Sequence, residues 1–236
     1  MVYIPEREIR MPLDRLSNLS RRLIVSCQPV PDGPMDRPDI VAATALAALA
    51  GGAAGLRLEG IANLRAVRAL SDAPVIGLVK RDLDDSPVRI TPYLDDIAAL
   101  AEAGAYIIAV DATDRPRPVA VAEQIAAIHA AGCIAMADCA TQADARAAHA
   151  AGAEVLGSTM SGYTGGTAPD TPDFDLVAAI SRLGAFTIAE GRYYTPEQAA
   201  RAIASGADAV VVGTALTRTE IATGWFAEAV AKVART

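Results

Sequence analysis

The chain has 236 residues, of which 52% are hydrophobic, and this is enough for one domain with a full core. Its formal net charge of −7 argues against nucleic-acid or anionic-membrane partners, because both need clustered Lys and Arg. Three cysteines without a C-x-x-C pairing or a signal peptide indicate a reducing cytoplasm. The longest apolar stretch, residues 40–49, is too short to span a bilayer. We therefore expect a cytoplasmic protein.

Eight apolar runs recur along the chain, and alanine-rich segments of helical length separate them. Near-continuous apolar runs are typical of parallel strands that are buried on both faces. Eight strand–helix units without linker composition favour an α/β fold of the closed (β/α)8 TIM barrel type. We expect residues 1–22 to form a short N-terminal helical extension packed on the barrel, and residues 23–236 to form a single catalytic barrel domain. The predicted strands cover residues 23–28, 55–59, 75–80, 105–111, 134–138, 154–158, 186–190 and 209–213.

Four threonines are expected to begin helices, because a threonine hydroxyl at the N-cap position accepts an otherwise unpaired backbone N–H. Proline directly after the threonine, or an acid or amide three residues on, strengthens the signal. The four are Thr91, Thr141, Thr171 and Thr195.

Polar residues at the ends of the predicted strands are the candidates for chemistry, because the C-terminal ends of the strands form the active face of such a barrel. Any one of them could also simply mark where solvent begins. They are Gln28, Arg57, Glu59, Lys80, Asp111, Asp138, Ser158, Thr159, Glu190, Gly213 and Thr214.

The last two predicted strands are each followed by glycine, at Gly191 and at Gly213. The loops after strands seven and eight of such barrels commonly bind phosphate through backbone N–H groups. A glycine there lets the backbone approach the anion. The pattern points to an enzyme acting on a phosphorylated small molecule.

Lys80 ends an apolar run and is expected over the mouth of the barrel, with its pKa lowered by partial burial. It could then remove a proton next to a carbonyl or condense with that carbonyl as a Schiff base. The sequence leaves both roles open. His129 and His149 lie at predicted helix C-termini, so acid–base chemistry would fall to Lys, Glu or Asp.

Other polar groups at the strand ends are expected to have supporting roles. Asp111 and Asp138 are a weak signal for a metal, and more readily hold sugar hydroxyls or buttress a neighbouring Lys or Arg. Cys27 and Cys139 have no histidine nearby in the sequence and are expected to be small buried hydrophobes.

Taken together, these motifs resemble the bacterial N-acetylmannosamine-6-phosphate 2-epimerase family of sialic-acid degradation. The Lys80-Arg81-Asp82 block and Ser161-Gly162-Tyr163-Thr164 are the more specific matches. Tyr193-Tyr194 departs from the family pattern of an aliphatic residue and a histidine. The matching stretches are residues 23–28, 77–82, 90–92, 111–113, 136–138, 158–164, 189–192 and 211–218.

The resemblance implies interconversion of N-acetylmannosamine 6-phosphate and N-acetylglucosamine 6-phosphate without a metal or an organic cofactor. It makes Lys80 the base that removes the C2 proton and Glu190 its acidic partner. It also implies that Gln28 and Arg57 orient or stabilise the developing oxyanion and that Asp138 and Thr159 contact the sugar. The phosphate would be held by backbone groups of Gly191, Arg192, Gly213 and Thr214 together with the guanidinium of Arg218.

Two other functions compete with this interpretation. Lys80 could be the Schiff-base residue of a phosphosugar aldolase or synthase, or the barrel could bind a phosphosugar without catalysis. In each case the partner is a small sugar phosphate. An apolar C-terminal helix around Trp225, Phe226 and Val230 is also expected to pack on a second subunit, which predicts a homodimer.

Overall fold

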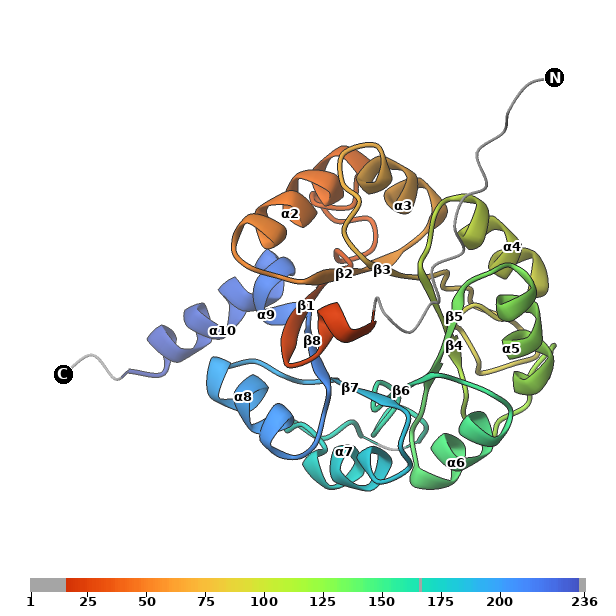
Figure 1. Cartoon of the computed structure of the whole chain (residues 1–236). Helices are drawn as coiled ribbons and strands as arrows, with labels where there is room; N and C mark the ends of the chain where they lie inside the picture. The colour runs from red at the N-terminus through yellow and green to blue at the C-terminus, as the bar shows by residue number, and fades with distance from the viewer. Residues whose placement is uncertain (1–15, 166, 234–236) are drawn as a thin grey trace, which may run out of the picture.

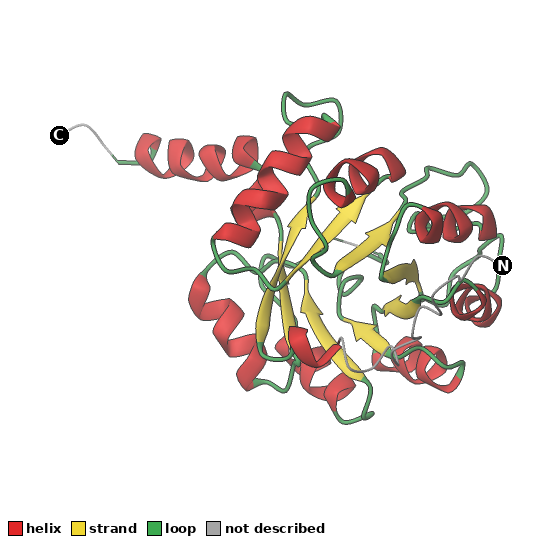
Figure 2. Cartoon of the chain, turned by 45° about the horizontal axis from the view of Figure 1, so that its top comes forward, coloured by secondary structure: helices red, strands yellow, loops and turns green. Residues whose placement is uncertain are grey.

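The computed structural model describes residues 16–165 and 167–233. Eight parallel strands close into a barrel in sequence order, and helices surround it (Figures 1 and 2). The predicted (β/α)8 fold is therefore confirmed. The strands are β1 (Arg22–Cys27), β2 (Gly55–Glu59), β3 (Val75–Leu78), β4 (Ile107–Asp111), β5 (Ile134–Asp138), β6 (Val155–Gly157), β7 (Phe186–Glu190) and β8 (Ala209–Val212). The helices are η1 (Ser17–Leu19), α2 (Pro38–Ala50), α3 (Ile61–Arg68), α4 (Leu94–Glu102), α5 (Val121–Ala130), α6 (Gln142–Ala150), α7 (Phe174–Ser181), α8 (Pro196–Ala204), α9 (Thr214–Thr217) and α10 (Thr219–Ala231).

The strands contribute to two hydrophobic layers, because successive side chains point to opposite faces of the sheet. Ile24, Ile76 and Ile107 belong to the cluster inside the barrel. Val25 and Ile108 belong to the cluster between the sheet and the helices. Burial on both faces accounts for the near-continuous apolar runs in the sequence.

The N-terminal end of the barrel is closed by η1. Leu16 and Leu19 are buried and join the cluster inside the barrel, and Figure 1 shows η1 close to the barrel axis. Most of the predicted N-terminal extension, residues 1–15, lies outside the described residues. The open end of the barrel is therefore the C-terminal end of the strands.

Strand β3 is shorter than predicted. The apolar run continues to Lys80, but the strand ends at Leu78, because its pairing with β4 stops at Gly77 and its pairing with β2 stops at Leu78. Lys80 instead forms an isolated antiparallel bridge with Ile90. Lys80 thus lies beyond the sheet, on the loop that follows β3.

Two of the four predicted helix starts are confirmed. Thr141 and Thr195 both form capping boxes, at α6 and α8 respectively. The predictions at Thr91 and Thr171 are wrong. The side chain of Asp173 caps α7, and α4 begins at Leu94 after Tyr93.

The C-terminal helix α10 projects away from the barrel (Figures 1 and 2). None of its residues is buried. Among the described residues, no helix has the length and apolar character needed to cross a membrane.

Candidate active site

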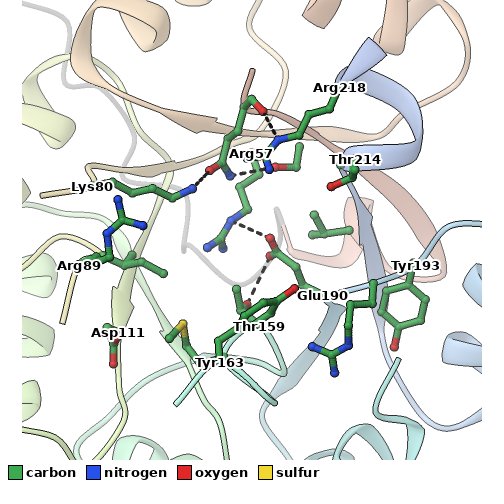
Figure 3. Close-up of a pocket in the computed structure, with 18 of the residues that line it drawn as sticks. Arg57, Lys80, Arg89, Asp111, Thr159, Tyr163, Glu190, Tyr193, Thr214 and Arg218 are labelled. Carbon is green, nitrogen blue, oxygen red and sulfur yellow. Dashed lines mark hydrogen bonds and ion pairs between the residues drawn. The ribbon is translucent and has the colours of Figure 1, made fainter. Parts of the chain in front are cut away.

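A cavity of about 480 Å³ opens at the C-terminal end of the barrel (Figure 3). Ten of the eleven residues predicted for the site line it, although the strands that carry them span most of the sequence. These ten are Gln28, Arg57, Lys80, Thr159, Glu190, Gly191, Arg192, Gly213, Thr214 and Arg218. The geometry confirms that these residues share a pocket, while their individual roles stay predictions.

Arg57 on β2 is 1% exposed and reaches across the barrel to two carboxylates. Its Nη2 lies 2.6 Å from Oδ2 of Asp138 on β5. Its Nε lies 3.2 Å from Oε1 of Glu190 on β7. A buried guanidinium needs such partners because desolvation of an unpaired charge is costly. Burial acts to lower the pKa of Arg57, and the two carboxylates outweigh it and raise that pKa.

Asp138 is the predicted site residue that does not line the cavity. Its carboxylate is fully buried and accepts bonds from Arg57 and from Thr159 Oγ1, the latter at 2.6 Å. Gly157 leaves room for this arrangement, because a Cβ there would lie 3.2 Å from Asp138 Oδ1 and 2.7 Å from Met136 Cε. The contacts of Asp138 therefore position Arg57 and Thr159, and its contact with the sugar stays a prediction.

The carboxyl group of Glu190 changes its protonation near neutral pH. Burial raises its pKa to about 7, and the neighbouring Asp138 acts in the same direction. Arg57 and Lys80 oppose this effect by favouring the charged carboxylate. The group therefore has both a proton donor and a proton acceptor form available at physiological pH.

Lys80 faces the same cavity from the loop after β3. Its Nζ donates to Gln28 Oε1 at 2.6 Å, and Gln28 Nε2 donates to Ser26 Oγ at 2.9 Å. Burial, together with the positive charges of Arg57 and Arg218, lowers the pKa of Lys80 to about 8, although Glu59 and Glu190 act to raise it. About a tenth of the Lys80 amine is therefore neutral at pH 7.

The loops after β7 and β8 lie on one side of the cavity. Gly191 and Arg192 both have a left-handed backbone, with φ of 112° and 63°. Arg218 precedes α10, and its Nε donates to the carbonyl oxygen of Gln28 at 2.9 Å. A Cβ at Gly213 would lie 3.1 Å from Ser26 Cβ, so a small residue is required where β8 meets β1.

The side chain of Arg192 is committed to protein contacts. Nη1 donates to the carbonyl oxygen of Ser161 at 2.6 Å, and Nε donates to that of Thr171 at 2.7 Å. The guanidinium also lies over the ring of Tyr163, 5.3 Å from its centroid. Arg192 thus joins the loop after β7 to the loop after β6.

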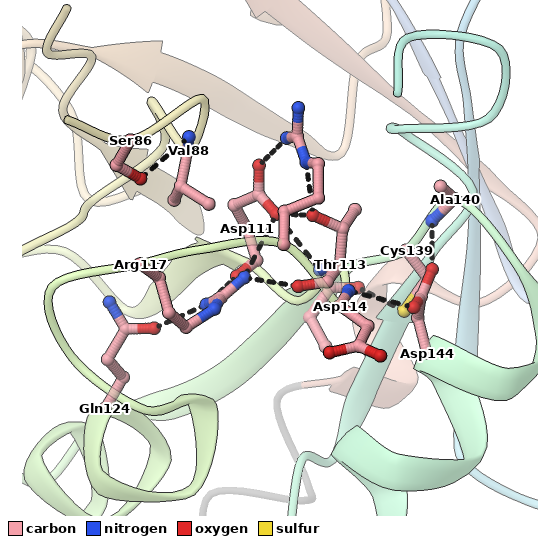
Figure 4. A network of polar contacts seen from close by, with 12 residues as sticks. Ser86, Val88, Asp111, Thr113, Asp114, Arg117, Gln124, Cys139, Ala140 and Asp144 are labelled. Carbon is pink, nitrogen blue, oxygen red and sulfur yellow. Dashed lines mark hydrogen bonds and ion pairs between the residues drawn. The ribbon is translucent and has the colours of Figure 1, made fainter. Parts of the chain in front are cut away.

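Asp111 is a buttress for arginine, as one of the predictions stated. Its side chain is 1% exposed and pairs with Arg115 at 2.6 Å and with Arg117 at 3.4 Å (Figure 4). Within residues 16–165 and 167–233, no cluster of three His, Cys, Asp or Glu side chains could hold a metal ion. Cys27 and Cys139 are buried, as expected.

Several cavity residues were missed because they lie on loops, some distance after the strand ends. Tyr163 lies within residues 158–164, one of the stretches that carry the family resemblance, and this resemblance was the available signal for it. Arg89 follows β3 by eleven residues and pairs with Asp82, and no local pattern marks it. Asp111 was a strand-end candidate without an assigned site role, and the lining residues that were not predicted at all are Ser26, Pro87, Arg89, Ile90, Arg115, Met160, Tyr163, Tyr193, Tyr194 and Val211.

The chain is similar to known proteins over most of its length. The family described as "Putative N-acetylmannosamine-6-phosphate epimerase" matches residues 41–232. An Actinobacillus pleuropneumoniae serotype 5b protein named "Putative N-acetylmannosamine-6-phosphate 2-epimerase" is 57% identical over 213 residues, which cover 90% of this chain and 93% of that protein. The bifunctional enzyme NanE/NanK of Brucella melitensis is 62% identical over 221 residues, covering 93% of this chain, and the chain spans 43% of its length.

A solved structure agrees with these sequence comparisons. The N-acetylmannosamine-6-phosphate 2-epimerase of Clostridium perfringens superposes with a TM-score of 0.88 at 33% identity. The superposition covers 97% of this chain and 99% of that chain. The chain therefore belongs to the N-acetylmannosamine-6-phosphate epimerase family.

Proposed function

We propose that this protein interconverts N-acetylmannosamine 6-phosphate and N-acetylglucosamine 6-phosphate, as a step in the catabolism of amino sugars and sialic acid. One observation carries the proposal beyond family membership. A lysine and a carboxylic acid face one cavity, and burial brings their pKa values to about 8 and about 7. Such a pair suits reversible proton transfer at neutral pH.

The reaction begins on the open-chain sugar, where the C1 carbonyl acidifies the C2–H bond. The neutral amine of Lys80 takes the C2 proton, and the electron pair of that bond passes into an enediolate whose oxygen carries the negative charge. A proton then returns to the opposite face of C2 and inverts that carbon, with Glu190 as the acidic partner. One turnover leaves Lys80 protonated and Glu190 ionised, and proton exchange with solvent water restores both groups, so atoms and charge balance without any other reactant.

The surrounding groups support this assignment. Gln28 holds the Nζ of Lys80, and Arg57 holds Glu190 while presenting a positive charge to the cavity. A preorganised cation near a developing oxyanion lowers the barrier because it does not have to reorient during the reaction. Asp138 accepts a hydrogen bond from Arg57, and Thr159 donates one to Glu190, so these contacts hold Arg57 and Glu190 in position.

We expect the phosphate to bind at the loops after β7 and β8. The residues that would hold it, through their backbone groups and the guanidinium of Arg218, all line the cavity: Gly191, Arg192, Gly213, Thr214 and Arg218. Binding energy from this remote group holds C2 against Lys80.

The active form is proposed to be a cytoplasmic homodimer. Helix α10 has no buried residue, and Phe226 and Val230 are each 74% exposed. An exposed apolar helix on a protein surface is typical of an interface with another chain. A second copy would cover this face.

The test is proton NMR of the purified protein with N-acetylmannosamine 6-phosphate in deuterated water. We expect N-acetylglucosamine 6-phosphate to appear with deuterium at C2. Lys80→Met should abolish both conversion and C2 exchange because Lys80 is the one lysine that lines the cavity among the described residues. Lys80 and Lys232 are the only lysines in the sequence, so Lys232→Met, at the residue that follows α10, is the matched control and should retain activity.

Two other outcomes would replace the proposal. Borohydride trapping of substrate on Lys80 without C2 exchange would identify a Schiff-base enzyme. Tight binding of the sugar phosphate without exchange or trapping would identify a binding protein.

A further inference from the structure

Thr91 adopts a conformation that its residue type disfavours. It is fully buried and has φ of 48°. A β-branched residue in the left-handed region is a genuine outlier, and a residue before proline, here Pro92, normally has an extended backbone. Such strain persists only where the surroundings impose it, and it clusters at functional sites. The proposed reaction leaves this residue without a role.

The contacts of Thr91 converge on the residue before Lys80. The backbone N–H of Thr91 donates to the carbonyl oxygen of Val79 at 2.7 Å. The backbone N–H of Val79 donates to Thr91 Oγ1 at 3.3 Å. One residue therefore satisfies both backbone polar groups of Val79, and its left-handed backbone allows the hydroxyl and the N–H to face the same neighbour.

Thr91 is itself held from a neighbouring element. Gln124 on α5 is 1% exposed, and its Nε2 donates to the carbonyl oxygen of Thr91 at 2.8 Å. Figure 4 shows Gln124 beside Arg117, which belongs to the network around Asp111. The bond from Gln124 thus links the helical layer to the loop that carries Lys80.

Lys80 depends on such support because β3 ends before it. Among the described residues, the only β pairing of Lys80 is the isolated bridge to Ile90. The backbone N–H of Lys80 donates to Glu59 Oε1 at 3.3 Å. Gln28 contacts the amine at the far end of the side chain, so the position of the amine also depends on the loop backbone from which the side chain starts. Proton abstraction requires that amine to stay within hydrogen-bond reach of its target.

We propose that Thr91 is a positioning residue that clamps the backbone of Val79 and thereby fixes the amine of Lys80 over the cavity. This inference rests on the proposed function only for its effect on turnover. Its effect on Lys80 itself is independent of substrate.

Lys80 can be observed directly, because protein labelled with [ε-13C]lysine contains only two labelled residues, Lys80 and Lys232. Titration by carbon NMR without substrate then reports each lysine, with Lys232 as the internal reference. The charged groups that face Lys80 are Arg57 and Glu59 on β2, Glu190 on β7, Arg218 before α10 and Arg89 on the loop of Lys80 itself. Displacement of the amine from burial and from Arg57 raises its pKa, so its titration should move upward.

Thr91→Val keeps the shape of the side chain and removes the hydroxyl acceptor. We expect the Lys80 titration to move upward by about one pH unit and kcat to fall about 10- to 100-fold, with KM changed less than about threefold. Thr91→Ser retains the hydroxyl and should keep both quantities close to the wild type. Thr141→Val is the matched control, because its hydroxyl also accepts a backbone N–H, that of Asp144, in a capping box away from the cavity. It should lower stability without moving Lys80.

Unchanged kcat and an unchanged Lys80 titration in Thr91→Val would overturn the inference. Gln124→Met supplies a second route if Thr91→Val does not fold, because it removes the bond to Thr91 and leaves Thr91 in place. A wild-type Lys80 titration in that variant would likewise overturn the inference. If the wild-type protein shows no C2 exchange but Thr91→Val still shifts the Lys80 titration, the positioning role holds and the proposed reaction fails.

Discussion

At the scale of single residues, the site consists of charged side chains that shift one another's pKa values. The guanidinium of Arg57 lies between the carboxylates of Asp138 and Glu190, and all three are almost completely buried. Both carboxylate oxygens of Asp138 accept hydrogen bonds from Arg57. The contacts of the Glu190 carboxylate with Arg57 and Thr159 are weaker, and burial raises the pKa of Glu190 to about 7. The two carboxyl groups thus lie in different environments, and such a difference is what lets neighbouring carboxyl groups take different functions.

The pKa values predict a narrow, bell-shaped pH profile. Proton transfer needs one proton shared between Lys80 and Glu190. Below about pH 7 both groups hold a proton and no base is present, whereas above about pH 8 both have lost it and no acid is present. We expect kcat/KM to be greatest between these values and to fall about tenfold per pH unit well outside them.

The measurement is kcat/KM across this range for the wild type and for Glu190→Gln. The residual activity of Glu190→Gln should lose the alkaline limb, because the amide does not titrate, and should keep an acidic limb that is set by protonation of Lys80 alone. Glu102→Gln, at an exposed position on α4, is the control and should leave the profile unchanged. A wild-type profile that is flat from about pH 6 to about pH 9 would contradict the assignment of both groups.

At the scale of elements, Arg192 connects two loops that carry different parts of the site. Its backbone belongs to the loop after β7, and its side chain binds carbonyl oxygens at both ends of the segment from Ser161 to Thr171. Tyr163, which lines the cavity, lies within that segment. The planar guanidinium is suited to this because it donates in two fixed directions.

Arg192→Lys should therefore weaken substrate binding more than turnover. A lysine amine cannot reproduce both bonds together with the contact to the Tyr163 ring. We expect KM for the sugar phosphate to rise about tenfold, with a smaller change in kcat. Steady-state kinetics measures this, and Arg65→Lys on the exposed side of α3 is the matched control. A fall in kcat at constant KM would show that Arg192 acts on the chemistry instead.

At the scale of the whole molecule, α10 is the helix that has no buried residue and projects away from the barrel. It projects outward from α9, and its apolar side chains are exposed. The ring of Trp225 on this helix packs against Tyr194, with centroids 4.9 Å apart, and Tyr194 lines the cavity. A subunit interface on α10 would therefore adjoin the substrate site.

The proposed dimer can be tested by sedimentation velocity at micromolar concentration. We expect the wild type to sediment as a dimer, and the double variant Phe226→Glu, Val230→Glu to sediment as a monomer, because buried unpaired carboxylates destabilise an apolar interface. Leu70→Glu is the control, since Leu70 is also an exposed hydrophobic residue, 59% exposed, but follows α3. A monomeric wild type at these concentrations would rule out the proposed interface.

The sequence alone was sufficient for the features that depend on local patterns. Residues 55–59, 134–138 and 186–190 were predicted as strands and have those bounds, because apolar runs and the turns beside them are local signals. The capping boxes at Thr141 and Thr195 are also local, since each involves residues three positions apart. Strand ends in a (β/α)8 barrel meet at one face, so most of the cavity residues followed from the fold class.

Only the tertiary structure decided what each side chain contacts. Asp138 is the last residue of its strand but lies beneath the cavity. Arg57, which is 81 positions away in the sequence, crosses the barrel to contact it. Thr91 carries the local signal of a helix start, yet its hydroxyl binds Val79, because the loop after β3 folds back on the strand end. These outcomes depend on packing between segments distant in sequence, and a burial pattern or a capping motif contains no information about such partners.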